Sequence, residues 1–110
     1  MPLVTAFNVR KDDPLSDIEE AVRHAMVRLP ALEIREHEVD FVPVCEPDGF
    51  PAVITRINVD LWEHRARTKE ALQDLAAGVA MAFRSVVGQE RKVKVVIRPY
   101  DIEKSGWVSF

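Results

Sequence analysis

The chain has 110 residues, of which 47% are apolar and 30% are charged, and its net charge is −3; this is typical of one globular domain. The slight negative charge and the lack of a basic run argue against nucleic-acid binding, and no apolar stretch is long enough to cross a membrane. Polar residues from Asn8 onward interrupt any apolar run near Met1, and the single Cys45 permits no intrachain disulfide. We therefore expect no signal peptide and a cytoplasmic protein.

The chain opens with Met1 and Pro2, ahead of a predicted strand over residues 3–9. Aminopeptidase normally removes a methionine that precedes proline, which would leave a free secondary amine at the head of this strand. An α-amino group titrates near ~8, and burial or a nearby cation lowers its pKa toward neutrality, where a general base works best. Pro2 is therefore a candidate base, although proline is also simply tolerated at the first residue of a strand. A retained Met1 would leave the Pro2 nitrogen without basicity.

Alternation over residues 3–9 predicts a strand with two distinct faces. Leu3, Thr5, Phe7 and Val9 form one face, and Val4, Ala6 and Asn8 form the other. From Leu15 to Leu29 the apolar residues recur at three- and four-residue spacing, which predicts an amphipathic helix that Pro30 ends.

The remaining elements follow from the same signals. They are a strand over residues 36–45, a loop over 46–51, a strand over 52–61, a helix over 68–87 that Gly88 ends, a strand over 93–97 and an irregular tail over 98–110.

The order strand–helix–strand therefore occurs twice. A shift of fifty residues aligns Thr5 with Thr55, among other matches, and predicts two pseudo-repeats, about 1–46 and 51–110, within a single domain. Each unit is a parallel strand pair with a right-handed crossover helix. Two units side by side predict an α/β (α+β) fold, in which a four-stranded mixed sheet carries both helices on one face.

The sheet face away from the helices is expected to stay partly apolar. Its predicted residues are Val4, Ala6, Ile54 and Val96, interleaved with Arg56, Asn58, Lys94 and Arg98. A half-apolar sheet face favours association. We expect these faces to meet in a closed ring of three copies.

With these features the chain resembles the tautomerase superfamily, whose members have a duplicated βαβ domain of this size that begins with Met-Pro. The stretch Ile57–Arg65, followed by a long helix, is similar to the strand, Glu-Gly-Arg turn and helix of 4-oxalocrotonate tautomerase, with His64 in place of glycine. Arg65-Ala66-Arg67 resembles the Arg-Pro-Arg of malonate semialdehyde decarboxylase. Residues 106–110, Gly-Trp-Val-Ser-Phe, resemble the C-terminal end of macrophage migration inhibitory factor.

The resemblance implies roles for five further side chains. Arg65 and Arg67 lie at the entrance to the predicted second helix, where the backbone and an arginine pair both suit an anion; two solvated arginines are the plainer interpretation. Lys94 and Arg98 share the strand face that lines the superfamily's pocket, or are charges that protect a strand edge. Trp107 lies where the family often has an aromatic wall, or only packs on a neighbour.

The expected function is that of a cofactor-independent tautomerase. Neutral Pro2 would move a proton within a small 2-oxo acid, while Arg65, helped by the other cations, would bind the carboxylate and the developing oxyanion. We expect no metal, since the histidines and Cys45 lack ligand spacing, and the resemblance implies a homotrimer. The alternatives are a decarboxylase or hydratase of a 3-carbon acid, with Pro2 as the acid, and a catalytically silent trimeric relative that binds an anion or serves as a scaffold.

Overall fold

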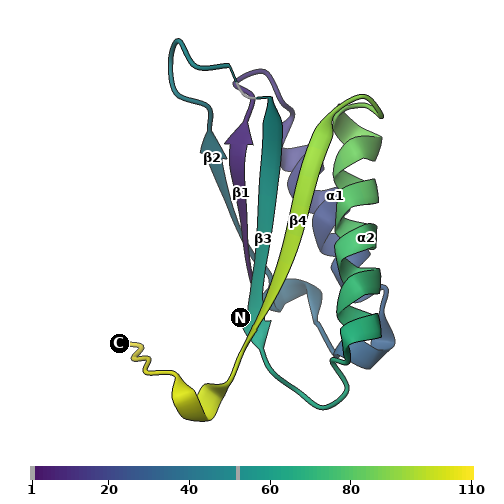
Figure 1. Ribbon diagram of the computed structural model, residues 1–110, viewed down its shortest axis with the longest axis vertical. Helices are drawn as coiled ribbons and strands as arrows, with labels where there is room; N and C mark the ends of the chain where they lie inside the picture. The colour runs from purple at the N-terminus through teal and green to yellow at the C-terminus, as the bar shows by residue number, and fades with distance from the viewer. Residues whose placement is uncertain (1, 52) are drawn as a thin grey trace.

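The computed structural model describes residues 2–51 and 53–110, so Met1 and Ala52 lie outside the described residues. The elements are β1 (Leu3–Val9), α1 (Leu15–Val27), η1 (Pro30–Leu32), η2 (Glu36–Glu38), β2 (Asp40–Cys45), β3 (Ile54–Trp62), α2 (Lys69–Val87), β4 (Lys92–Tyr100) and η3 (Ile102–Lys104), where η denotes a 3₁₀ turn. The sheet order is β2-β1-β3-β4, with parallel outer pairs and an antiparallel central pair. Both helices cover one face (Figure 1), which confirms the predicted fold class.

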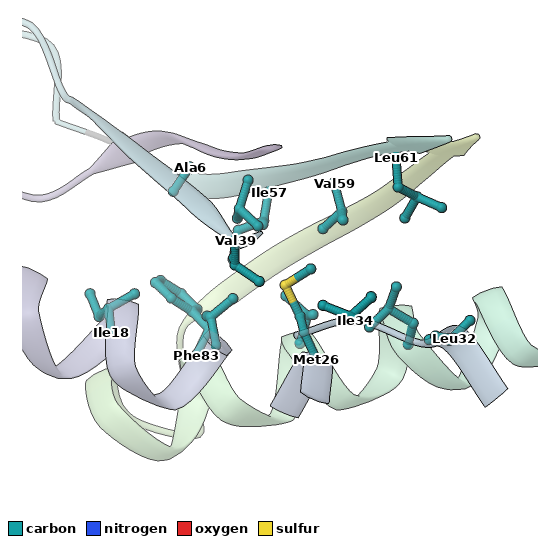
Figure 2. Packing of buried hydrophobic residues seen from close by; sticks show 14 of the residues in the cluster. Ala6, Ile18, Met26, Leu32, Ile34, Val39, Ile57, Val59, Leu61 and Phe83 are labelled. Carbon is teal, nitrogen blue, oxygen red and sulfur yellow. The ribbon is translucent and has the colours of Figure 1, made fainter. Parts of the chain in front are cut away.

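The two helices bury one stripe each against the sheet. Residues four apart face the strands, because that spacing lies on one side of a helix. The stripes are Ile18, Val22 and Met26 on α1 and Leu75, Val79 and Phe83 on α2. They meet Ala6, Ile57, Val59 and Leu61 from the two central strands, so the core lies between the sheet and the helix layer (Figure 2).

The prediction of which face of β1 is buried is wrong. Val4 and Ala6 pair with Val59 and Ile57 across the antiparallel ladder, and all four are fully buried. They face the helices, whereas Leu3, Thr5 and Phe7 lie on the opposite, open face. Both faces of β1 are largely apolar, so alternation alone did not reveal which of them the helices cover.

Asn8 explains a second difference. Its φ of 60° is left-handed, and the register between β1 and β2 shifts between Phe7 and Val9. Val9 therefore turns to the helix side and is fully buried, although alternation grouped it with Phe7. The fifty-residue shift also fails as a structural alignment, because Thr5 lies on the open face and Thr55 lies on the helix face.

Three predicted strand boundaries also differ. The second strand begins at Asp40 rather than at residue 36, because Glu36–Glu38 forms a 3₁₀ turn. The third ends at Trp62. The fourth extends to Tyr100, so residues 98–100 belong to the strand and not to the predicted tail. Pro99 is tolerated there because β4 is an edge strand, where a missing N–H need not break a ladder bond.

The open face of the sheet divides into an apolar and a polar part. We call the apolar part the open-face patch; it consists of Phe7, Val42, Val44 and Ile54, all partly exposed, next to Phe50 and Val53 of the β2–β3 loop. The polar part lies on β3 and β4 and includes Arg56, Asn58, Asp60, Lys94 and Arg98. The predicted half-apolar composition of this face is therefore found, though with different residues on β1.

A buried ion pair joins the two βαβ units at the end of the sheet remote from Pro2. Arg91, just before β4, donates to both oxygens of Asp13 in the β1–α1 loop, at 2.7 and 3.0 Å. It also donates to the Thr55 hydroxyl and lies over the Phe83 ring. Burial alone would raise the pKa of Asp13, but the hydrogen bonds and charge of Arg91, with the Arg10 N–H, lower it below its usual value.

Candidate active site

Pro2 lies buried at the head of β1. Its carbonyl accepts a hydrogen bond from the Asp40 N–H at 3.0 Å, which fixes it beside the first residue of β2. On the other side of β1, Leu3 pairs with Asp60 of β3. The last residues of β3 therefore lie near Pro2. The start of β1, the β3–α2 loop and the C-terminal tail all come to this end of the sheet (Figure 1).

Arg65 is exposed in the middle of the loop that links β3 to α2. Among the residues that the structure describes, its side chain makes no hydrogen bond or ion pair. It lines a shallow groove of about 470 Å³ together with Glu63, His64, Arg67, Asp101, Ile102 and Glu103. Three carboxylates share this groove with the arginines, so its charge is mixed rather than purely cationic.

Arg67 has a different environment from Arg65. Its Nε and Nη2 donate to the Leu32 carbonyl at 3.2 and 3.0 Å, and its Nη1 donates to the Trp62 carbonyl at 2.5 Å. Burial lowers the pKa of Arg67, and the charges of Glu33 and Glu38 act in the opposite direction. The guanidinium therefore binds backbone, and much of its donor capacity is already used.

The two cations predicted on β4 lie on the open face at different levels of the sheet. Arg98 forms a bidentate pair with Asp60, at 2.6 and 2.9 Å, and these hydrogen bonds raise the pKa of Arg98. Because Asp60 pairs with Leu3, Arg98 is near the level of Pro2. Lys94 pairs with Arg56, and Arg56 pairs in turn with Phe7. Lys94 therefore lies beside the part of β1 that is far from Pro2. A single chain therefore does not bring Lys94 to Pro2.

Trp107 contacts an aromatic residue that the sequence interpretation did not select. Its ring centroid lies 6.3 Å from that of Trp62, with the planes tilted by 49°, while 65% of Trp107 stays exposed. Trp62 ends β3 two residues beyond Asp60, which pairs with Leu3. Asp60 was also missed as the partner of Arg98. Opposite charges on the same face of adjacent predicted strands were the available signal for that pair.

Within residues 2–51 and 53–110, no three His, Cys, Asp or Glu side chains are grouped so that they could hold a metal ion. Of the helices described, none is both long and apolar enough to span a bilayer.

The comparisons with known proteins identify the fold. No protein-family model and no curated protein matches the sequence. Among solved structures, a fused 4-OT trimer gives a TM-score of 0.77 at 17% identity, over 96% of this chain and 92% of that one. Pt0534, inactivated by 2-oxo-3-pentynoate, gives a TM-score of 0.74 at 18% identity, over 96% of this chain and 90% of that one. A malonate semialdehyde decarboxylase inhibited by 3-bromopropiolate gives a TM-score of 0.69 at 16% identity, over 99% of this chain and 89% of that one. The chain therefore shares the fold of these solved structures.

Proposed function

We propose that this protein is a cofactor-independent tautomerase that moves a proton within a small 2-oxo acid. The observation that carries the proposal is the buried position of Pro2, at the sheet end to which the loop of Arg65 also comes. Removal of Met1 gives Pro2 a secondary amine, and burial favours the neutral, basic form of such an amine. The experiment is a steady-state assay with the enol of a phenyl-substituted pyruvate.

The proposed reaction moves one proton and needs no other reactant. The neutral nitrogen of Pro2 takes a proton from the carbon next to the carbonyl, so a C–H bond breaks and an N–H bond forms. In a 2-oxo acid with a conjugated C=C bond, the electron pair left on carbon delocalises into the carbonyl as a dienolate, and the same N–H returns the proton at the far carbon of the conjugated system. With a simple enol, Pro2 takes the hydroxyl proton instead and returns a proton to the adjacent carbon. Arg65 supplies the positive charge that binds the carboxylate and stabilises the enolate oxygen.

Arg65→Ala is expected to lose on the order of 2 to 4 kcal/mol of transition-state binding, because the enolate loses its cationic partner. The readout is kcat/KM, and Arg65→Lys should retain part of the activity because charge remains. Arg28→Ala, a change of an exposed arginine at the end of α1, is the matched control and should be silent. An Arg65→Ala loss below ~1 kcal/mol would remove Arg65 from the proposed site.

We also propose that the protein is a homotrimer assembled through the open face. The fused 4-OT structure is a trimer, and the open-face patch leaves apolar side chains partly exposed. An assembly that buries these side chains would remove apolar surface from water.

Phe7→Asp is therefore expected to dissociate the assembly, because a carboxylate would be buried without a partner. Sedimentation should give three times the chain mass for the wild type and one chain for the variant. Met81→Asp is the control, since Met81 is 71% exposed on α2 and lies outside the open-face patch. If Phe7→Asp sediments like the wild type, the open face is not the interface.

A decarboxylase or hydratase of a 3-carbon acid is the second candidate. The observation that favours it is the group of carboxylates lining the groove beside Arg65, which are Glu63, Asp101 and Glu103. Carboxylates accept hydrogen bonds from water and can orient it for attack. In this reaction Pro2 would be protonated and would polarise a carbonyl. Turnover of malonate semialdehyde without turnover of the enol would favour this candidate, and no turnover of either would favour a catalytically silent scaffold.

A further inference from the structure

Arg67 makes an unusual set of contacts for a loop arginine. Its Nε and Nη2 converge on one carbonyl, that of Leu32, while Nη1 reaches the carbonyl of Trp62. A carboxylate that binds an arginine in a bidentate manner accepts hydrogen bonds from two parallel N–H groups of the guanidinium. The Nε–Nη2 fork of Arg67 is already occupied by protein backbone.

The two carbonyls belong to different halves of the fold. Leu32 ends η1 in the first βαβ unit and is 1% exposed, so it is fixed by the core. Trp62 ends β3, two residues beyond the Asp60 that pairs with Leu3. Arg67 therefore connects a rigid point of the first unit to the end of a central strand of the second.

The same residue closes the loop that carries Arg65. The Arg67 N–H donates to the His64 carbonyl at 2.8 Å, and the Ala66 N–H donates to His64 Nδ1 at 3.2 Å. Arg65 lies inside this turn. The guanidinium of Arg67 thus binds two backbone carbonyls outside the turn, and its backbone N–H closes the turn that contains Arg65.

We infer that Arg67 is a positioning residue: it binds the backbone of Leu32 and Trp62 and thereby holds Arg65 toward the substrate, rather than binding the substrate carboxylate itself. This inference rests on the proposed function for its kinetic consequence. Its structural part, the fixing of the turn, stands without that function.

The first test measures the turn directly and needs no activity. Arg67→Met removes all three donors, and Arg67→Lys keeps the charge but cannot bridge two carbonyls in the same geometry. Hydrogen exchange at the amides of Ala66 and Arg67 (or its replacement) should become at least tenfold faster in both variants, while the amides of the central strands stay protected. Arg28→Met is the control and should leave the turn unchanged. Unchanged exchange in the turn would overturn the inference.

The second test separates positioning from direct binding through a double-mutant cycle. In the wild type, Arg67→Met should lower kcat/KM about 10- to 100-fold, as expected when a catalytic group is misplaced. In an Arg65→Ala background the same change should have little further effect, because the residue being positioned is gone. Equal losses in both backgrounds would show that Arg67 acts independently, and would overturn the inference.

The two tests also distinguish this inference from the proposed function. If the protein turns over no 2-oxo acid, but the turn exchanges faster in both Arg67 variants, the proposed function fails and the structural role of Arg67 is supported. If Arg67→Met does not fold, Arg67→Lys supplies both measurements.

Discussion

Replacing Pro2 with alanine is expected to lower kcat/KM for a 2-oxo acid by about 10²- to 10⁴-fold, the usual contribution of a positioned general base. Alanine keeps a primary amine, but it loses the ring that fills this buried position and fixes the direction of the nitrogen. The measurement is steady-state kinetics on untagged protein, with Pro47→Ala as the control because Pro47 lies exposed in the β2–β3 loop.

An N-terminal extension gives a sharper comparison than the alanine variant. A chain that carries an uncleaved extension ahead of Met1 keeps the Pro2 ring but turns its nitrogen into an amide, which has no basicity. We expect this chain to be at least as impaired as Pro2→Ala and to keep its thermal stability. Full activity in the extended chain would contradict the proposed role of Pro2.

Replacing Arg91 with methionine is expected to destabilise the fold by about 3 to 5 kcal/mol, the usual cost of removing one partner from a buried ion pair. The side chains of Arg91 and Asp13 are 6% and 7% exposed, so the variant leaves the Asp13 carboxylate buried without its partner. Urea unfolding measures the loss. Lys11→Met is the control: Lys11 pairs with Asp48 at the surface, and such pairs contribute ~1 kcal/mol or less.

Acid provides an independent check of the same pair. The folded-state pKa of Asp13 is below its usual value of 3.8, so folding favours the ionised form. The stability that this gives is present above pH ~4 and is lost as the pH falls through the lowered, folded-state pKa. We expect the unfolding free energy of Asp13→Asn to depend less on pH below ~4 than that of the wild type. An identical dependence would mean that Asp13 contributes nothing there.

The periodic parts of the sequence predicted most of the fold. The helix stripes of α1 and α2 specify one buried face each, and the strict alternation of β3 specifies its faces without ambiguity. On β1 alternation failed, because Leu3 and Phe7 are as apolar as Val4 and Val9. Burial there was decided by pairing with β3 and by the left-handed Asn8, and neither is visible in a single strand.

The site was less accessible to sequence reasoning than the fold. The sequence indicated Pro2 and the loop of Arg65, because both are local features. Sequence reasoning gave Arg67 a role in binding the substrate beside Arg65, since nothing in the neighbouring sequence predicts that the Leu32 carbonyl comes within reach of Arg67. That contact is between residues far apart in the sequence. The same limit applies to Arg98, whose partner Asp60 lies on another strand.

The most direct test of the proline amine is covalent labelling with 2-oxo-3-pentynoate, the compound that inactivates Pt0534. A neutral amine adds to its activated triple bond, whereas an amide does not. The exposed thiol of Cys45 is the competing nucleophile, so the measurement uses Cys45→Ser. We predict an intact mass that lacks Met1, a gain of one inhibitor per chain, and the label on the peptide that begins with Pro2. A chain that retains Met1, or one that stays unlabelled at Pro2, would contradict the account.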